Sequence, residues 1–585
     1  MKGFSPKRPV WLSLMVTTLV VAGFSAYFTA GASPAKAAPA VYHAKAAPYM
    51  AMNGHNTPLA RSGNGTLRDH EGDPGDDDTS PSPTLSALCQ NYIGQPNPYN
   101  NPAPNVDQIN GDTVVTVGSQ TGCDAAQNET TIAVNPWNPF NLVAGTNDYR
   151  VFNTREQRND SSGYAYVTFD GGKTWTDVQL PHLTFQTGAN GALSDMDSAG
   201  DPALSFGPFN TVYYANLVFS RLNNASGIVV SISHDGGLHW GEPGIVRLDG
   251  VDANGNPLDT GVFNDKEWVA VDPFNPNVAY VTWTTFLDDG ASPIVVSKTT
   301  DGGKTWSAET QVNPVSSFTP GGITPFSSGS YPLIDRRGRL FIAYESAVCQ
   351  TLNCDQATDH DAVIVARSTD GGQTFTNTEV SADFDFPFNP DVGRETLTNE
   401  NFRINSFPSA AIDPVTGRLY VTWADDRNGQ YYANGNSIQT NGDVFLSASA
   451  DGVHWSKTPT QIGTAQDEVY PAVAAYAGHV VVTFYTRHWD ANGINLDYAW
   501  ASPRGHANVQ RITTQSENPQ VQFVANGLVN TQDILQGVFI GDYTAVAMGS
   551  DLRFHPCWTD FRGNPSIAND TPNQDAYTQS IFLGA

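Results

Sequence analysis

A short turn-like pattern recurs along the chain and constrains its fold more than any other feature. The pattern reads Ser/Thr-x-Asp-Gly-Gly-x-x-Trp/Phe, and it occurs four times in full and once in a form one residue shorter. The copies occupy residues 168–175, 233–240, 299–306, 368–375 and 449–455. Their aspartates lie 65, 66, 69 and 81 residues apart. Although 585 residues would ordinarily suggest several domains, a repeat of this period predicts one array of similar units.

Each copy has the chemistry of a tight hairpin turn. The aspartate can accept backbone N–H bonds across the turn, and the glycines allow positive φ. The hydroxyl adds a local hydrogen bond, and the closing aromatic ring is expected to pack between neighbouring sheets. Because the aspartate recurs from unit to unit, we interpret it as part of the scaffold rather than as a catalytic group.

A second repeat, upstream of each turn, counts the units. It consists of a short strand, a turn and a more apolar strand, first at residues 130–134 and 141–145. Later copies begin near Asp201, Glu267, Tyr331, Phe407, Tyr470 and Asp542. Abundant glycine (53) and proline (38), with 11% aromatic residues, fit many short strands joined by tight turns. We predict an all-β propeller of seven four-stranded blades, with six or eight as the alternatives.

The last unit has sequence patterns for three strands and none for a fourth. An unassigned strand pattern, residues 113–117, precedes the first unit. We predict that this N-terminal strand completes the last blade, because a closed ring leaves no open sheet edge.

The N-terminus has the features of an export signal. Lys2, Lys7 and Arg8 precede an apolar run over residues 10–32, and Ala35-Lys36-Ala37 offers a small-residue cleavage site. We predict a signal peptide over residues 1–37, or an uncleaved membrane anchor, since the run is long enough to span a bilayer. A disordered Pro/Ser/Asp-rich spacer over 38–110 and the propeller over 111–585 follow, so the protein is expected to be secreted or tethered to the cell surface.

The charge and the cysteines agree with that location. A net charge of −28 disfavours nucleic acid as a partner. Cys349 and Cys354 are expected to form a small-loop disulfide and Cys89 and Cys123 a second one, as in extracellular proteins. Cys557 is left over and is expected to be a buried free thiol.

The recurring turn resembles the Asp box, or bacterial neuraminidase repeat, of the sialidase superfamily over roughly residues 125–460. The region 112–585 is similar to bacterial sialidase-like propellers as a whole. The resemblance implies a β-propeller that acts as a glycoside hydrolase. Because Asp boxes also occur in sorting receptors and assembly factors, a non-catalytic carbohydrate-binding or adhesion propeller is the second hypothesis.

Propeller geometry predicts where a site would lie. If each first strand descends the central channel, the starts of the first strands and the ends of the second strands converge on the upper face. That face collects three candidate catalytic residues, with Glu267 and Glu345 as acid/base and Tyr485 as nucleophile. The candidate substrate-binding residues are Arg403, Arg427, Arg487, Arg562 and Trp489. Carboxyl groups flank the bond that glycosidases cleave, and arginines fork onto carboxylates, so an extracellular acidic glycan is the expected partner.

Two sequence patterns bear on whether these arginines bind substrate or stabilise their own loops. Asp-x-Arg recurs at Asp148/Arg150, Asp425/Arg427 and Asp560/Arg562, and residues two apart on a strand share a face, so each pair could pin its own loop. Phe402-Arg403-Ile404 matches the start of the sialidase Phe/Tyr-Arg-Ile-Pro motif, with Asn405 in place of proline. The resemblance implies that Arg403 grips a substrate carboxylate.

No cofactor and no metal are expected, although two loops leave calcium open. Residues 252–257 begin like a calcium-binding loop, but Pro257 stands where an EF-hand requires glycine. Residues 490–493 are similarly incomplete. Ordinary Asx-Gly turns explain both.

Overall fold

The computed structural model describes residues 42–43, 105–109, 126–155, 158–288, 290–313, 326–348, 360–389, 394–432, 436–503, 506–519, 539–562 and 574–583. They belong to one compact unit, Val41–Ala585. The predicted signal segment, both predicted disulfides and the strand pattern at 113–117 lie outside these residues. Among the described residues no helix has the length and apolar character needed to cross a bilayer.

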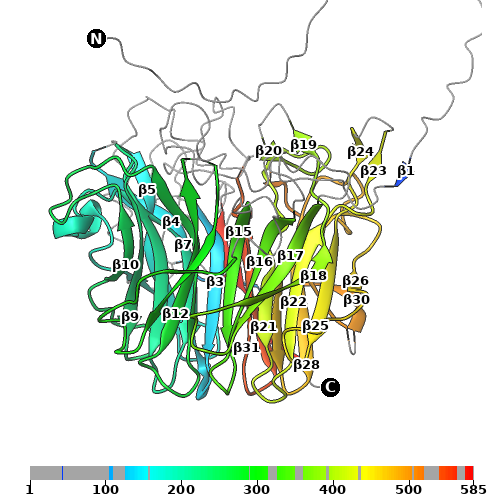
Figure 1. Cartoon of the computed structure of the whole chain (residues 1–585). Helices are drawn as coiled ribbons and strands as arrows, with labels where there is room; N and C mark the ends of the chain where they lie inside the picture. The colour runs from blue at the N-terminus through cyan, green and yellow to red at the C-terminus, as the bar shows by residue number, and fades with distance from the viewer. Residues whose placement is uncertain are drawn as a thin grey trace, which may run out of the picture. The chain divides into compact units, whose positions relative to one another are not determined.

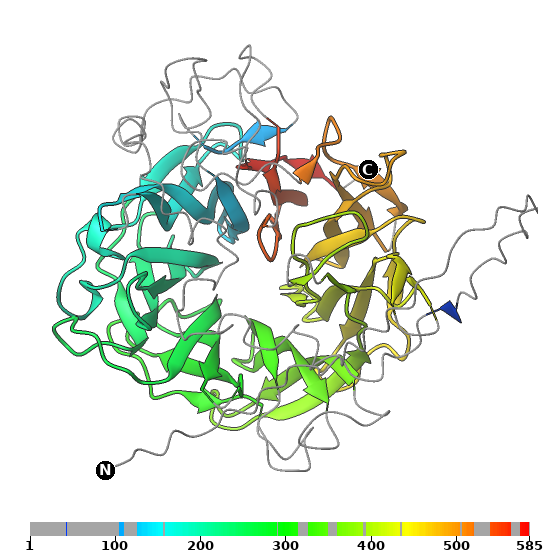
Figure 2. The same cartoon turned by 90° about the horizontal axis from the view of Figure 1, so that it is seen from above.

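In this part of the chain, seven antiparallel sheets stand around one axis (Figures 1 and 2). Blade 1 consists of β3 (Gln127–Asn135), β4 (Asn138–Asn153), β5 (Arg158–Thr168) and β6 (Thr176–Gln179). Blade 2 consists of β7 (Ser198–Phe206), β8 (Val212–Phe219), β9 (Ser226–Ser233) and β10 (Gly244–Asp249). Blade 3 consists of β11 (Val262–Val271), β12 (Ala279–Leu287), β13 (Ile294–Thr299) and β14 (Thr310–Gln311). Blades 4 and 5 are β15 (Ser327–Ile334), β16 (Leu340–Val348), β17 (His360–Ser368), β18 (Thr376–Ala382); and β21 (Ser409–Ile412), β22 (Leu419–Asp425), β25 (Asp443–Ser449), β26 (Thr460–Ile462). Blades 6 and 7 are β27 (Glu468–Tyr476), β28 (His479–Thr486), β29 (Asp497–Ser502), β30 (His506–Arg511); and β31 (Ala545–Met548), β32 (Arg553–Asp560), β33 (Asp575–Thr578), β2 (Val106–Asp107), with β34 (Ile581–Phe582) also paired to β32. The predicted seven-bladed all-β propeller is confirmed.

Short elements decorate the blades. They are η3 (Phe185–Thr187), η4 (Gly191–Leu193), β1 (Tyr42–His43), β19 (Phe388–Asn389), β20 (Arg394–Glu395), β23 (Gln430–Tyr431) and β24 (Ser437–Gln439). β1 pairs with β23 beside blade 5. Part of the segment predicted as a spacer therefore contacts the propeller.

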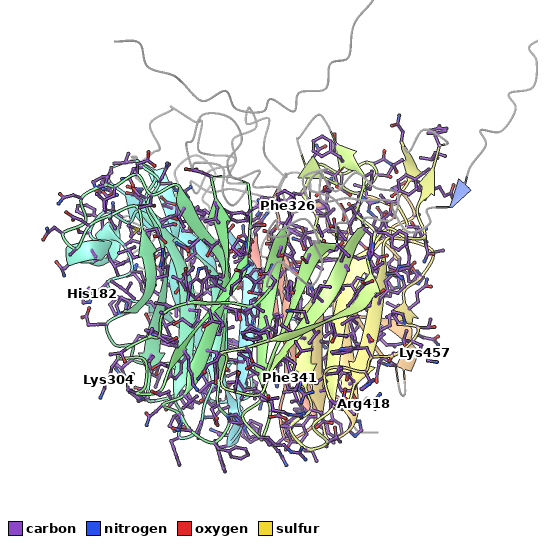
Figure 3. The ribbon with its side chains drawn as sticks, viewed as in Figure 1. His182, Lys304, Phe326, Phe341, Arg418 and Lys457 are labelled. Carbon is purple, nitrogen blue, oxygen red and sulfur yellow. The ribbon has the colours of Figure 1, made fainter. Side chains whose placement is uncertain are left out.

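The first strand of each blade lines the axis and descends from the upper to the lower face. Figure 3 shows Phe326, just before β15, at the upper end, whereas Lys304, in the turn between β13 and β14, lies at the lower end. The repeated turns join third and fourth strands and therefore occupy the lower rim.

Blade 7 is completed from the N-terminus, but by a different segment from the one predicted. Val106 pairs with Thr578 and Asp107 with Tyr577, so β2 is the outer strand. Residues 106–107 lie within the region predicted as a spacer, which has no strand-like apolar pattern. Closure of the ring by an N-terminal strand is confirmed, whereas the assignment of that strand to residues 113–117 is wrong.

The repeated turns have the predicted hydrogen bonds. Asp170 accepts the main-chain N–H groups of Lys173 and Thr174, and Thr168 Oγ1 donates to Asp170 Oδ1 at 2.8 Å. Gly171 and Gly172 adopt φ of 77° and 86°. The same hydroxyl-to-aspartate bond recurs in the other four copies. The closing aromatic rings pack in or against the inter-blade clusters, at Trp175, Trp240, Trp306, Phe375 and Trp455.

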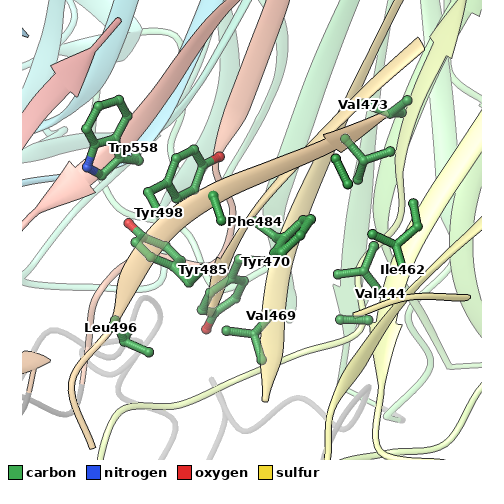
Figure 4. Packing of buried hydrophobic residues seen from close by; sticks show 14 of the residues in the cluster. Val444, Ile462, Val469, Tyr470, Val473, Phe484, Tyr485, Leu496, Tyr498 and Trp558 are labelled. Carbon is green, nitrogen blue, oxygen red and sulfur yellow. The ribbon is translucent and has the colours of Figure 1, made fainter. Parts of the chain in front are cut away.

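The core is distributed between the blades. The largest cluster joins blades 5, 6 and 7, and within it Tyr498 stacks on Trp558 with ring centres 5.2 Å apart (Figure 4). Cys557, on β32, is a free, fully buried thiol as predicted. It donates to Gln108 Oε1 at 3.1 Å, which ties blade 7 to the N-terminal segment that closes it.

Candidate active site in the axial channel

The first strands carry β-bulges at one level of the channel. The ladder register shifts there in blades 1, 2, 3, 4 and 6. One residue in each bulge has positive φ, namely Glu129 (54°), Asp201 (49°), Lys266 (52°), Gly329 (65°) and Tyr470 (51°). Bulges re-aim side chains, and positive φ is strained for residues other than glycine. This strain is therefore concentrated where the inner strands face one another.

Lys266 connects the bulges of three blades. Its Nζ lies 2.8 Å from Asp201 Oδ2, 2.8 Å from Asp542 Oδ2 and 3.3 Å from Glu129 Oε1. All four side chains are buried, with at most 7% of the side chain exposed. Residues far apart in the chain thus meet in one ionic network, which only the radial arrangement of the blades permits.

Arg403 extends this network from the segment before blade 5. Its guanidinium binds Asp542 through two bonds, Nε to Oδ1 at 2.8 Å and Nη2 to Oδ2 at 2.6 Å, and covers the Phe539 ring. The main-chain N–H of Asp542 donates to Glu129 Oε1 at 3.0 Å. We call Glu129, Asp201, Lys266, Arg403 and Asp542 the channel cluster.

The carboxyl groups of this region differ in their affinity for protons. Burial, reinforced by Asp201, raises the pKa of Glu129 well above its usual range. Burial likewise raises the pKa of Glu267, and that of Asp265 to about 7. Burial alone would raise the pKa of Asp542 too, but Arg403 and Lys266 outweigh it and lower that pKa. Neighbouring carboxyl groups in this region therefore have pKa values shifted in opposite directions, which is a typical arrangement for acid–base chemistry.

A small cavity of about 40 Å³ borders the cluster. Aromatic side chains form much of its wall, with Trp268 stacked on Tyr331 at 4.5 Å between ring centres and Phe407, Tyr470 and Tyr543 nearby. Lys266 and Asp542 contribute the charged part of the wall. This volume accommodates a few water molecules.

The structure brings two predicted site residues to this place. Arg403 is a member of the channel cluster, and Glu267 follows Lys266 in β11 and interacts electrostatically with Asp201 and Lys266. The other three predicted arginines bind carboxylates of their own. Arg427 pairs with Asp425, Arg562 with Asp560 and Glu517, and Arg487 with Asp467 and Glu400. The Asp-x-Arg pairs therefore fix their own loops.

Three further predicted residues lie in separate contacts. Tyr485 is 2% exposed, and its hydroxyl donates to the Thr559 carbonyl at 2.7 Å within the core. Trp489 is partly buried beneath the Arg511 guanidinium. Glu345, on β16, lies with Asp361 and Asp385, and ligand oxygens of these three buried residues lie within 4.8 Å of one another. That group could hold a cation.

Sequence reasoning places Glu129, Asp201, Lys266 and Asp542 on the upper face but gives none of them a role. All four stand among the upper-face residues at the starts of first strands. Their only sequence signal is a polar residue just before each apolar inner strand. Nothing in the sequence marks the bulges that hold Glu129, Asp201 and Lys266.

No protein-family model and no curated protein matches this chain. Among solved structures, the chain aligns with a Hadza microbial sialidase at 13% identity and a TM-score of 0.37, covering 76% of this chain and 73% of that one. It also aligns with a Penicillium chrysogenum α-L-arabinanase complexed with arabinobiose at 14% identity and a TM-score of 0.40, covering 66% and 93%. With a Trypanosoma rangeli sialidase in complex with the inhibitor DANA the identity is 13% and the TM-score 0.38, and the alignment covers 65% of this chain and 55% of that one. These values are too low to assign this chain's chemistry.

Proposed function

We propose that this chain is a glycoside hydrolase and that the channel cluster carries its acid–base chemistry. The supporting observation is the contact between Glu129, whose pKa is raised, and the main chain of Asp542, whose carboxyl pKa is lowered. Glycosidases use one protonated and one ionised carboxyl group on either side of the bond they cleave. The Asp-box resemblance of the sequence favours the same class of reaction.

In this proposal Glu129 gives its proton to the leaving oxygen as the glycosidic C–O bond breaks, and a water molecule then adds to the anomeric carbon and returns a proton to Glu129. Asp542, whose pKa is lowered by Arg403 and Lys266, supplies the negative charge that stabilises positive charge developing on the sugar ring. Trp268 and Tyr331 stack on each other beside these groups and give the adjoining cavity an aromatic wall.

The charges favour a neutral substrate over the acidic glycan expected from the sequence. Each of the four arginines assigned to a substrate carboxylate is already bound by at least one carboxylate of the protein. An acidic sugar would have to displace these partners and approach a region with more carboxyl groups than cations. We therefore propose a neutral extracellular glycan. The basic start and apolar run at residues 1–37 support an extracellular location.

A panel of neutral and acidic aryl glycosides, together with natural polysaccharides, tests the proposal. Glu129→Gln should lower kcat on the best substrate at least 100-fold, since general acid catalysis contributes about 10²–10⁴. Glu468→Gln is the matched control, because Glu468 is also a buried, first-strand carboxyl with a raised pKa, but lies outside the channel cluster. Turnover that survives Glu129→Gln would refute the role of the cluster.

The second hypothesis is a non-catalytic carbohydrate-binding propeller. The small cavity and the internally paired arginines favour it, since both are typical of a scaffold. Glycan binding without turnover of any member of the panel would establish this alternative in place of hydrolysis.

A further inference from the structure

The second strands of four blades carry a residue that packs against the Asp-box turn of the following blade. We call the interface between two neighbouring blades a seam. In four seams this residue is valine, tyrosine or phenylalanine and lies beside the last glycine of the turn. The pairs are Val143 with Gly237, Tyr213 with Gly303, Tyr280 with Gly372 and Phe341 with Gly452. Each of these side chains belongs to the hydrophobic cluster of its seam, so the position serves packing between blades.

The seam between blade 7 and blade 1 has a histidine at this position. His555 lies in β32, the second strand of blade 7, and pairs with Ala547 of β31. A methyl group added to Gly172, the last glycine of the blade 1 turn, would lie 3.6 Å from His555 Nδ1. The seam that closes the ring therefore has an imidazole where the four other seams have an uncharged packing residue.

The imidazole of His555 is buried without hydrogen bonds. The residue is 1% exposed, and neither Nδ1 nor Nε2 has a hydrogen-bond partner among the described residues. The hydrophobic cluster of this seam includes Trp175 of blade 1 and Ala547 and Cys557 of blade 7. A buried polar group without a partner destabilises a fold, so packing alone does not account for a histidine here.

The segments around this ring carry few charged groups. Arg553 precedes His555 on β32, and Asp551 in the β31–β32 turn accepts the N–H of Arg553. Asp170 and Lys173 lie in the blade 1 turn, where Asp170 accepts N–H groups of that turn. The β3–β4 turn has no charged residue. Neither carboxylate bonds the imidazole, and burial, reinforced by Arg553, lowers the pKa of His555 to about 4.

This lowered pKa links protonation of His555 to opening of the seam. A histidine that reaches water has a pKa near 6.5, so acid favours any state that exposes the ring. The stability that neutral His555 gives the closed seam is complete above about pH 6.5 and is lost as the pH falls toward 4. Between pH 7.5 and pH 5 the ratio of open to closed seams should rise about 30-fold.

Blade 7 is held in the ring by short strands. Its first strand, β31, has four residues, and its outer strand, β2, has two. Hydrogen bonds to blade 1 are few, and one of them runs from Thr130 Oγ1 to the Cys557 carbonyl at 2.7 Å. Local opening is favoured where few contacts must break together, and this seam meets that condition.

We propose that the seam between blades 7 and 1 is an acid-sensitive latch, which opens when His555 is protonated while the other blades stay folded. Histidine suits this role because its charge changes in mildly acidic solution. Opening separates the blade that is completed by the N-terminal segment from the first blade of the propeller. This inference is independent of the proposed hydrolase activity.

Modification of Cys557 by the thiol reagent dithiodipyridine measures opening, because this buried thiol lies two residues from His555 on the same face of β32. Mass spectrometry of the Cys557 peptide gives the rate in the full chain. Division by the rate in urea-unfolded chain at the same pH removes the pH dependence of the reagent. We expect this ratio to rise about 30-fold from pH 7.5 to pH 5.

His555→Phe, which copies the residue of the blade 4–5 seam, should abolish the rise. His555→Tyr copies two other seams and provides a second uncharged variant if phenylalanine does not fit. His479→Gln, which changes an exposed histidine on β28, is the matched control and should keep the rise.

A rise that persists in both folded His555 variants would overturn the proposal, as would a wild-type ratio that does not change with pH. Amide hydrogen exchange across blades 2 to 4 distinguishes local from global opening. An equal acid-dependent increase there would also overturn the proposal, because the chain would then unfold as a whole.

Discussion

The Asp-box turns and the channel cluster both depend on carboxyl groups, yet their surroundings act on those groups in opposite ways. In the turns, Thr305 donates to Asp301 through its hydroxyl and its main-chain N–H and lowers the pKa of that aspartate to about 2. In the channel, burial raises the pKa of Asp265 to about 7. A carboxylate that recurs among hydrogen-bond donors stabilises its turn. A single carboxyl group buried among like charges has a raised pKa, which suits it to proton transfer.

Loss of Lys266 should lower the free energy of unfolding more than any of the other substitutions that follow. Lys266→Met leaves Glu129, Asp201 and Asp542 without their shared cation, so the free energy of unfolding at pH 7 should fall by about 3–5 kcal/mol. Urea unfolding measures it. The control, Lys304→Met in an exposed turn, should change the value by less than about 0.5 kcal/mol. A cost below about 1 kcal/mol for Lys266→Met would mean that the cluster is not a buried ionic network.

The pH dependence of stability next distinguishes a carboxyl group whose pKa is raised by burial from one whose pKa is lowered in an exposed turn. The pKa of Glu468 is raised by burial to about 8, so its folded-state pKa exceeds the unfolded one. Its stabilising contribution is complete below about pH 4 and is lost as the pH rises through about 8. Asp301 behaves oppositely, because its contribution is lost as the pH falls below about 4 toward 2. Stability should therefore be greatest in mildly acidic solution.

Urea unfolding at pH 3, 5 and 8 checks this profile. Between pH 5 and pH 8, Glu468 should account for about 3 kcal/mol of the decline, from the size of its pKa shift. Glu468→Gln should flatten the profile by that amount. An equally steep decline in this variant would assign the effect to other groups.

The smallest effect is expected from a single Asp-box turn. Asp170→Ala removes an acceptor of the Lys173 and Thr174 N–H groups, which should lower the free energy of unfolding by about 1 kcal/mol. Turnover should remain within twofold, because the turn lies on the lower rim. Lys173→Ala in the same turn is the control and should be neutral. A loss of turnover in Asp170→Ala would contradict the scaffold interpretation of the boxes.

The fold could be predicted from the sequence because its determinants are local and repeated. Five Asp-Gly turns with a following aromatic residue fix the third hairpin of five blades, and paired strand patterns supply the count of seven. The closing strand could not be located in this way. Val106 and Asp107 form only a two-residue strand, and it exists because β33 offers an unpaired edge from the far end of the chain.

The candidate site could be predicted only as a region. Glu267 and Arg403 lie in or beside the channel cluster because the convergence of the first-strand starts follows from the blade geometry alone. The partners of a side chain depend on bulges and on packing between blades. Tyr485, for example, stands at the end of a second strand but points into the core, where it bonds the Thr559 carbonyl. Sequence position alone does not show whether a side chain points toward the axis or into the core.

The pairing of Val106 with Thr578 also has a consequence for biosynthesis. β2 has no partner until β33 has been made, so blade 7 cannot be completed before the other six blades have been synthesised. Ring closure joins the most distant segments of the propeller and is the contact with the greatest loop entropy to overcome. Until that moment the nascent protein carries an incomplete sheet, whose backbone groups remain open to other chains.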